Sequence, residues 1–351
     1  MLNIMAKKTD MRALEAVREP HRLKNLFLEL TLRCNERCLH CGSRCGDVKA
    51  EEMTPAQYHE VLKQIAGDFN IKDFTLCITG GEPLIRSDFF DIMDDANRQG
   101  YLWGMTSNGI LITPEVAKDL HRTGMKTISI SIDGTEATHD AFRRTPGGWK
   151  KAMEGVENLI REGGFQHIQV TTVVTHKNID QLDELYKIFS EMDLDSWRIV
   201  NIDPIGRAKE FPDLLMTPED TVRMFEYIRN MRMKGEPVTY GCEHWLGMDY
   251  EHEVRDWYFH CGAGREIASI MCNGDITACL DIERRPEFVM GNIFKDRFKD
   301  VWENGFQIFR KGLSCENCEK CGEYEFCKGG AYHTWNFDEN RPDICFKDIL
   351  F

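Results

Sequence analysis

Long apolar runs and a surplus of basic residues are both missing from this sequence. No stretch approaches the roughly 18 consecutive apolar residues of a transmembrane helix, and the N-terminus lacks the apolar core of a signal peptide. Lysine and arginine number 44 against 58 aspartates and glutamates, which gives a net charge of −14. Because binding to a phosphate backbone needs clustered basic side chains, this charge argues against nucleic-acid partners. We therefore expect a cytoplasmic protein with no membrane partner and no nucleic-acid partner.

Cysteine, by contrast, is abundant, with 14 in 351 residues. In a reduced compartment, thiols bind metals more often than they form disulfides. One group lies between residues 34 and 45 and a second between residues 261 and 345, whereas Cys77 and Cys242 are isolated. With 42% hydrophobic residues, a chain of this length can bury a large core. We expect one large domain followed by a smaller, metal-binding one.

The first cysteine group follows an apolar run directly. Cys34, Cys38 and Cys41 are spaced Cys-x₃-Cys-x₂-Cys in the loop after Leu32. Three thiolates so close in sequence can hold three irons of one 4Fe–4S cluster and leave the fourth iron open, although such clusters usually have four cysteine ligands. A structural zinc site is the alternative, because zinc takes four ligands, often from Cys-x₂₋₄-Cys pairs. The spacing alone leaves both alternatives open.

Strand-like and helix-like segments alternate through the first two thirds of the chain. Thr-Pro pairs at 54–55, 113–114 and 217–218 are typical of helix starts. Six βα units in series predict a parallel sheet with helices outside it, and they are too few for a closed eight-stranded barrel. The fold class is therefore α/β, a partial (β/α)₆ TIM-like barrel. Its expected strands, rich in β-branched and apolar residues, are 25–32, 74–79, 102–106, 127–132, 167–174 and 197–202.

Short polar motifs stand at the carboxyl ends of the second, third and fourth expected strands. Each one, taken alone, is typical of an ordinary turn. In βα barrels, however, the chemistry is carried by the loops after the strands. We therefore expect these residues to gather around the three-cysteine loop. They are Gly80, Gly81, Glu82 and Pro83 after the second strand, Ser107 and Asn108 after the third, and Ser131, Asp133 and Arg143 after the fourth.

The last quarter of the chain contains the second cysteine group. Its eight cysteines are enough for two four-ligand clusters. A zinc ribbon on four of them is the alternative, because pairs with two intervening residues also suit zinc. The eight are Cys261, Cys272, Cys279, Cys315, Cys318, Cys321, Cys327 and Cys345.

Together, the three-cysteine loop, the Gly-Gly-Glu-Pro turn and the cysteine-rich extension resemble the radical S-adenosylmethionine (SAM) enzymes that carry a SPASM domain. The resemblance covers nearly the whole chain after residue 24. It implies a lead-in helix over 1–24, a partial barrel over 25–232, a linker over 233–258 and a SPASM domain over 259–351. In that family, a 4Fe–4S cluster on the loop cleaves SAM reductively to a 5′-deoxyadenosyl radical, which removes a hydrogen atom from the substrate.

The resemblance also implies roles for individual residues. Glu82 and the Gly-Gly backbone would receive the amino group of SAM, Ser131 would contact its ribose and Arg143 its carboxylate. His40, just before the third cysteine, would border the adenine. Hydroxyls and carboxylates at the other strand ends would complete the SAM-binding set, namely Ser107, Asn108 and Asp133.

Two auxiliary 4Fe–4S clusters are implied for the C-terminal region. By analogy, Cys318, Cys321, Cys327 and Cys345 would hold the outer cluster. A further cysteine of the family pattern is replaced here by Ala331, so the inner cluster lacks one expected ligand. The region still has eight cysteines, enough for two clusters, so other cysteines can replace the missing ligand. The inner cluster would then be held by Cys261, Cys272, Cys279 and Cys315. The alternative is an open iron in the inner cluster, which binds substrate or is capped by His333.

We therefore predict an enzyme that modifies a peptide or protein side chain and matures a ribosomally made peptide by crosslinking or oxidation. An external one-electron donor of flavodoxin or ferredoxin type would reduce the first cluster. About 24 residues precede the first strand, too few for the N-terminal peptide-binding domain of some relatives. A leader peptide would then need another docking surface or a separate protein.

Other functions stay open at this point. Formylglycine formation, as in anaerobic sulfatase maturases, expects a carboxylate next to Cys279, but the nearest one is Asp281. Side-chain chemistry on a tetrapyrrole is another alternative. A non-catalytic iron–sulfur electron carrier belongs to a different class, and the SAM-type turn argues against it because a carrier needs no SAM pocket.

Overall fold

The computed structural model describes residues 15, 21–241, 244–248, 250–256 and 258–350. Most of the predicted lead-in helix over 1–24 lies outside these ranges, and so does Cys242. No helix within the described ranges is long and apolar enough to cross a membrane.

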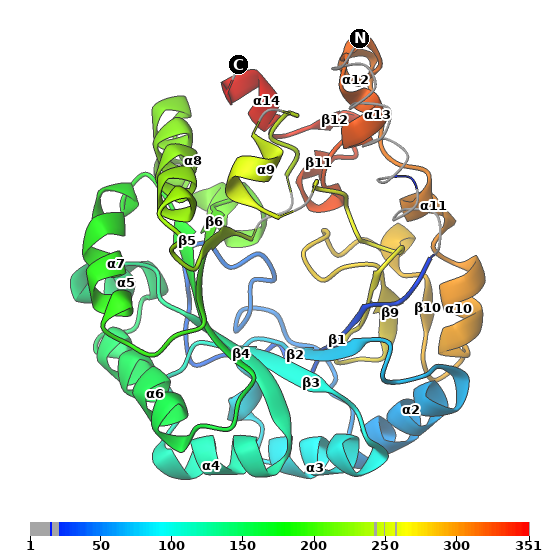
Figure 1. Cartoon of the computed structure of the whole chain (residues 1–351). Helices are drawn as coiled ribbons and strands as arrows, with labels where there is room; N and C mark the ends of the chain where they lie inside the picture. Colours follow the sequence, from blue (N-terminus) through cyan, green and yellow to red (C-terminus); the bar gives the residue numbers. More distant parts are fainter. Residues whose placement is uncertain (1–14, 16–20, 242–243, 249, 257, 351) are drawn as a thin grey trace.

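A curved sheet of ten strands, in the order β10-β9-β8-β1-β2-β3-β4-β5-β6-β7, forms the centre of the molecule (Figure 1). Neighbouring strands from β1 to β7 pair in parallel, as the alternating sequence pattern predicts. The six expected strands are all present. They are β1 (Asn25–Glu29), β2 (Thr75–Thr79), β3 (Trp103–Ser107), β4 (Met125–Ser131), β5 (His167–Val174) and β6 (Ser196–Asn201).

The sheet extends beyond those six strands on both sides. β7 (Val238–Tyr240) pairs in parallel with β6, inside the range predicted as a linker, and α9 (Glu251–Val254) follows it. β8 (Ile267–Ile270), from the cysteine-rich part, pairs in parallel with β1. β9 (Asp275–Thr277) and β10 (Gly291–Asn292) then continue the sheet as antiparallel strands. The sequence reasoning missed these strands because two to four residues are too few to show a period.

Helices cover the outer face of the sheet in chain order (Figure 1). The Thr-Pro starts are confirmed, since Thr54 and Thr217 each form a capping box and Thr113 caps through its hydroxyl. The helices of the barrel are α2 (Pro55–Asp68), α3 (Phe89–Gln99), α4 (Pro114–Arg122), α5 (Glu136–Arg143), α6 (Gly148–Glu162), α7 (Leu182–Ser190) and α8 (Pro218–Met233).

The rest of the C-terminal region consists of short elements. α12 (Glu316–Lys320) carries Cys318 and α13 (Tyr324–Cys327) carries Cys327, and the 3₁₀ turn η6 (Tyr332–Thr334) follows Ala331. β11 (Trp335–Asn336) and β12 (Arg341–Pro342) form a separate two-stranded ribbon. The helices are α10 (Phe298–Asn304), α11 (Gln307–Arg310), α12 (Glu316–Lys320), α13 (Tyr324–Cys327) and α14 (Phe346–Leu350).

One large hydrophobic core spans barrel and C-terminal region alike, from Leu26 on β1 to Phe346 on α14. It packs the helices onto the sheet and leaves the carboxyl ends of the strands free to carry polar side chains.

Candidate active site

The three-cysteine loop begins directly after β1 and is bonded to the turn that follows β2. The backbone N–H of Gly81 donates to the Thr31 carbonyl at 2.7 Å, and that of Glu82 donates to the Arg33 carbonyl at 3.0 Å. A Cβ atom at Gly81 would lie 2.1 Å from the Arg33 oxygen. Only glycine permits this approach, so the Gly-Gly pair is explained by close contact with the loop.

Glu82 lies fully buried at the centre of the site. Its carboxylate accepts hydrogen bonds from the Ser107 hydroxyl at 3.0 Å and from the backbone N–H of Asn108 at 2.8 Å and of Leu84 at 3.2 Å. Burial raises the pKa of Glu82 to about 7, and the hydrogen bonds oppose this shift only in part. A cationic group brought next to this carboxylate would favour its ionised form.

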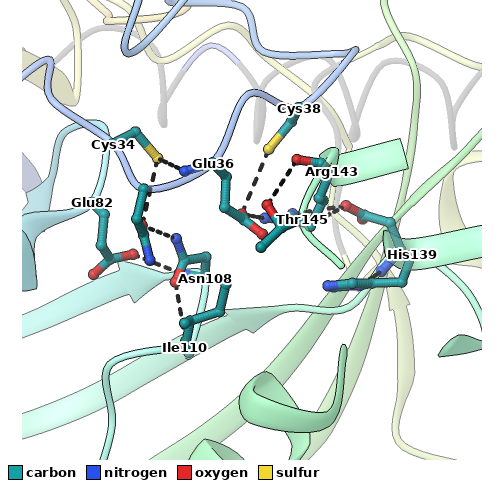
Figure 2. Close-up of polar contacts among 12 residues, drawn as sticks. Cys34, Glu36, Cys38, Glu82, Asn108, Ile110, His139, Arg143 and Thr145 are labelled. Carbon is teal, nitrogen blue, oxygen red and sulfur yellow. Dashed lines mark hydrogen bonds and ion pairs between the residues drawn. The ribbon is translucent and has the colours of Figure 1, made fainter. Parts of the chain in front are cut away.

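Asn108 connects the third strand to the cysteine loop. Its side-chain amide donates to Asn35 Oδ1 at 2.7 Å, and its own Oδ1 accepts from the N–H of Ile110 at 3.1 Å. Figure 2 shows Cys34, Glu82 and Asn108 gathered on this side of the site. Four predicted positions, Glu82, Ser107, Asn108 and the loop, are therefore joined by direct contacts.

Arg143 ties the other side of the loop to β4. Its guanidinium donates to Asp133 Oδ2 and to Glu36 Oε2, each at 2.7 Å. Figure 2 shows Arg143 beside Glu36. All three side chains are buried. Burial opposes ionisation of Asp133, but the charge of Arg143 prevails and lowers the pKa of that carboxyl. Arg143, predicted to meet the SAM carboxylate, is thus already held by two protein carboxylates.

Ser131 and His40 also lie at this end of the barrel. Ser131 is the last residue of β4, two positions before Asp133. The imidazole of His40 stacks on Phe142 with a centroid distance of 4.5 Å and an angle of 9°. Burial lowers the pKa of His40 to about 4, so the ring is neutral at physiological pH. A neutral, flat ring in this position suits contact with an aromatic base.

The loop thiols have surroundings suited to metal ligation. The N–H of Glu36 donates to Cys34 Sγ at 3.4 Å, and that of Cys45 donates to Cys41 Sγ at 3.3 Å. The contact with Cys45 lowers the pKa of Cys41 to about 6, whereas burial raises that of Cys34 to about 11. Iron binding would offset the cost of ionising the buried thiols, because a coordinating thiol is deprotonated outright. The half-buried sulfurs and their N–H donors fit an iron–sulfur cluster.

The sequence reasoning missed Glu36, and it placed Arg207 near the site without giving it a contact. Glu36 bridges Cys38 and Arg143, with 3.6 Å between its Oε2 and Cys38 Sγ. Arg207 donates to the carbonyls of Cys38 at 2.6 Å and Cys45 at 2.8 Å. Arg207 belongs to residues 203–208, which follow the sixth expected strand and resemble a family element at the open mouth of the barrel, near SAM or the substrate. Nothing in the spacing of Glu36 indicated its partner.

The C-terminal cysteines fall into separate neighbourhoods. Cys318, Cys321 and Cys345 lie close enough to Cys327 for their charges to add to the burial that raises its pKa to about 12. Cys315 Sγ lies 3.2 Å from Cys318 Sγ, so Cys315 is next to the predicted outer set.

Of the proposed inner ligands, Cys261, Cys279 and Cys315 pack against the large hydrophobic core. Cys272 packs with Leu32 and Cys45, on the side of the first loop. Ala331 is buried with Trp245 and Phe326, in the apolar cluster against which Cys261 packs. Cys279 follows β9, with its Sγ 3.9 Å from Asp281 Oδ2. The assignment of Cys272 and Cys315 to the inner cluster remains a prediction.

Fold and site together define a barrel enzyme with an iron–sulfur loop at the carboxyl end of its first strand. A family model described as the radical SAM superfamily matches residues 28–189, and one described as the SPASM iron-sulfur cluster-binding domain matches residues 261–322. The chain belongs to the radical SAM superfamily and is a radical SAM enzyme with a SPASM domain.

Proteins of similar sequence align with most of the chain. The mycofactocin maturase MftC of Mycobacterium tuberculosis is 31% identical over 326 residues, which span 87% of this chain and 77% of that protein. The AdoMet-dependent heme synthase of Methanosarcina barkeri is 27% identical over 344 residues, 91% of this chain and 95% of that protein.

Solved structures share the fold. Streptococcus suis SuiB bound to its precursor peptide SuiA superposes with a TM-score of 0.72 at 18% identity. The match covers 99% of this chain and 80% of the SuiB chain. The enzyme anSMEcpe with bound AdoMet and the Cp18Cys peptide gives 0.73 at 19% identity, with 93% of this chain and 94% of that chain covered. At these identities the likeness concerns the fold alone.

Proposed function

We propose that this enzyme generates a 5′-deoxyadenosyl radical at the Cys34, Cys38 and Cys41 loop and uses it to modify a side chain of a ribosomally made peptide. The observation that carries the proposal is the joining of polar groups from the first four strand ends around that loop. Glu82, Asn108 and Arg143 each contact the loop or its immediate neighbours. Cys34, Cys38 and Cys41 would hold a 4Fe–4S cluster, which would supply the electron for cleavage of SAM.

The chain's own residues would bind and orient SAM. The buried Glu82 carboxylate would receive the amino group, and Ser107 and the N–H of Asn108 hold it in place. The paired Asp133 and Arg143 fix the opposite wall, and Arg143 would share its charge with the SAM carboxylate. Ser131 would contact the ribose, and the stacked His40 would border the adenine.

Auxiliary clusters would occupy the C-terminal region. We propose that Cys318, Cys321, Cys327 and Cys345 hold the outer cluster, a set supported by the mutual influence of these thiols. The inner cluster would use Cys261 and Cys279, with Cys272 and Cys315 as the remaining ligands. The buried Ala331 beside Cys261 is consistent with a ligand lost at that position.

The similarity to the mycofactocin maturase MftC, at 31% identity, favours peptide maturation over the other candidate reactions. Tetrapyrrole chemistry is the second candidate, supported by the heme synthase at 27% identity over 91% of this chain. A flavodoxin or ferredoxin would supply the first electron in either case.

Deuterium transfer from candidate substrates tests the proposal. Reduced, cluster-reconstituted enzyme would be incubated with SAM and either deuterated Cys- or aromatic-rich peptides encoded near its gene or a deuterated tetrapyrrole. We expect deuterium in 5′-deoxyadenosine and a changed peptide mass only with a peptide. Transfer from the tetrapyrrole alone would replace the first proposal with the second.

A further inference from the structure

Three side chains from distant parts of the chain meet beyond the end of β6. They are Asp203, His244 and His333. The Nε2 atom of His244 lies 3.0 Å from Asp203 Oδ1, and that of His333 lies 3.0 Å from Oδ2. Each side chain is 4–7% exposed, and one ligand atom from each lies within 4.8 Å of the others. The trio brings two imidazole nitrogens and a carboxylate together in a buried place.

Neighbouring groups hold the carboxylate in position. The side-chain amide of Asn201 donates to Asp203 Oδ1 at 2.7 Å, and the Tyr240 hydroxyl donates to Asn201 Oδ1 at 2.6 Å. The imidazole of His244 packs edge-on against Phe346, with 4.8 Å between centroids. Such outer partners are what fix the orientation of metal ligands in proteins.

The trio also has a place suited to chemistry. Asp203 follows β6 at the end of the barrel that carries the first cysteine loop, and Arg207, four residues on, donates to the Cys38 carbonyl. His333 lies in η6, two residues after Ala331. The three ligands therefore join the mouth of the barrel to the C-terminal region.

We propose that Asp203, His244 and His333 bind one divalent first-row transition-metal ion, for which Zn²⁺ is the probe. Two histidines and one carboxylate form the ligand set of catalytic zinc sites, which keep a fourth position open for water or substrate. Ligand atoms about 2.0–2.1 Å from a tetrahedral ion lie roughly 3.3 Å apart. Here the two nitrogen-to-oxygen spacings are 3.0 Å, and all three ligand atoms lie within 4.8 Å of one another. The site offers nitrogen and oxygen donors, so it differs from the thiolate clusters. In this proposal His333 binds the metal ion of the trio and does not cap an open iron of the inner cluster.

Zinc binding to the holoenzyme tests this proposal. Iron and sulfide are first reconstituted to fill the cysteine sites, then Zn²⁺ is added and the protein is desalted. Wild type should retain about one zinc more than Asp203→Asn or the double variant His244→Gln/His333→Gln. His176→Gln is the matched control, because His176 pairs with Asp220 at 2.7 Å but belongs to no three-ligand group in the described ranges.

X-ray absorption at the zinc edge identifies the donors in wild type alone. The proposal expects a nitrogen and oxygen shell at about 2.0–2.1 Å and no sulfur shell at about 2.3 Å. Because this measurement needs no variant, it holds even if the double variant fails to fold. Equal zinc in wild type and Asp203→Asn, or a sulfur shell, overturns the proposal and leaves the trio as a hydrogen-bonded contact.

Discussion

The two cysteine-rich regions differ in how the surrounding protein holds their cysteines in place. The loop of Cys34, Cys38 and Cys41 is contacted by the buried side chains of Arg143 and Arg207, which donate to Glu36 and to the Cys38 carbonyl within the loop. Cys318, Cys321 and Cys327 lie on or beside α12 and α13, helices of five and four residues. Helices this short are not stable alone. The barrel therefore shapes the first site through protein contacts, whereas the second region depends more on its metal.

Removal of iron should produce the largest difference between the two regions. Without clusters, the backbone around α12 and α13 loses its main constraint, while strands β1 to β4 keep their core and hydrogen bonds. We expect amide hydrogen exchange to become roughly 100-fold faster over residues 315–328, with little change in β1 to β4. Equal acceleration in both regions after chelation would contradict the comparison.

Replacement of Arg143 should destabilise the protein strongly. Arg143→Gln leaves the buried Glu36 and Asp133 carboxylates without their cation, which typically costs about 3–5 kcal/mol. Urea unfolding measures this change, and Arg98→Gln is the control because the Arg98 side chain is 71% exposed. A loss below about 1 kcal/mol would mean that the Arg143 pairs do not hold the loop.

Glu82→Gln should act on SAM binding more than on folding. The variant keeps the shape of the side chain but loses the charge that would meet the SAM amino group, a contact of about 1.5–3 kcal/mol. We expect SAM affinity to fall about 10- to 100-fold in equilibrium binding, with the iron content unchanged. Wild-type affinity in Glu82→Gln would remove Glu82 from the SAM site.

Two single cysteine variants sharpen the account of the inner cluster. If Cys272 and Cys315 are ligands, Cys272→Ala and Cys315→Ala should each lower iron content and change the cluster spectra. Cys77→Ala is the control, because Cys77 lies within β2 and burial raises its pKa to about 12. Unchanged iron content and spectra in Cys315→Ala would show that Cys315 is not a ligand of the inner cluster.

Much of the barrel could be predicted because its signals are local. The caps at Thr54 and Thr217 and the apolar strands each lie within a few residues of the structure they specify. The pairing of Glu36 with Arg143 joins residues 107 positions apart, and no local pattern encodes it. The meeting of His244 and His333 at Asp203 was hidden for the same reason, because their neighbourhood exists only after β7 and the C-terminal region have joined the barrel.

The most direct test of the central claim is 5′-deoxyadenosine formation by dithionite-reduced, cluster-reconstituted enzyme with SAM. Wild type should form 5′-deoxyadenosine and methionine, while Cys38→Ala should form neither and still show the spectra of the auxiliary clusters. Absence of 5′-deoxyadenosine from wild type, even with candidate substrates, or equal formation by Cys38→Ala, would contradict the account.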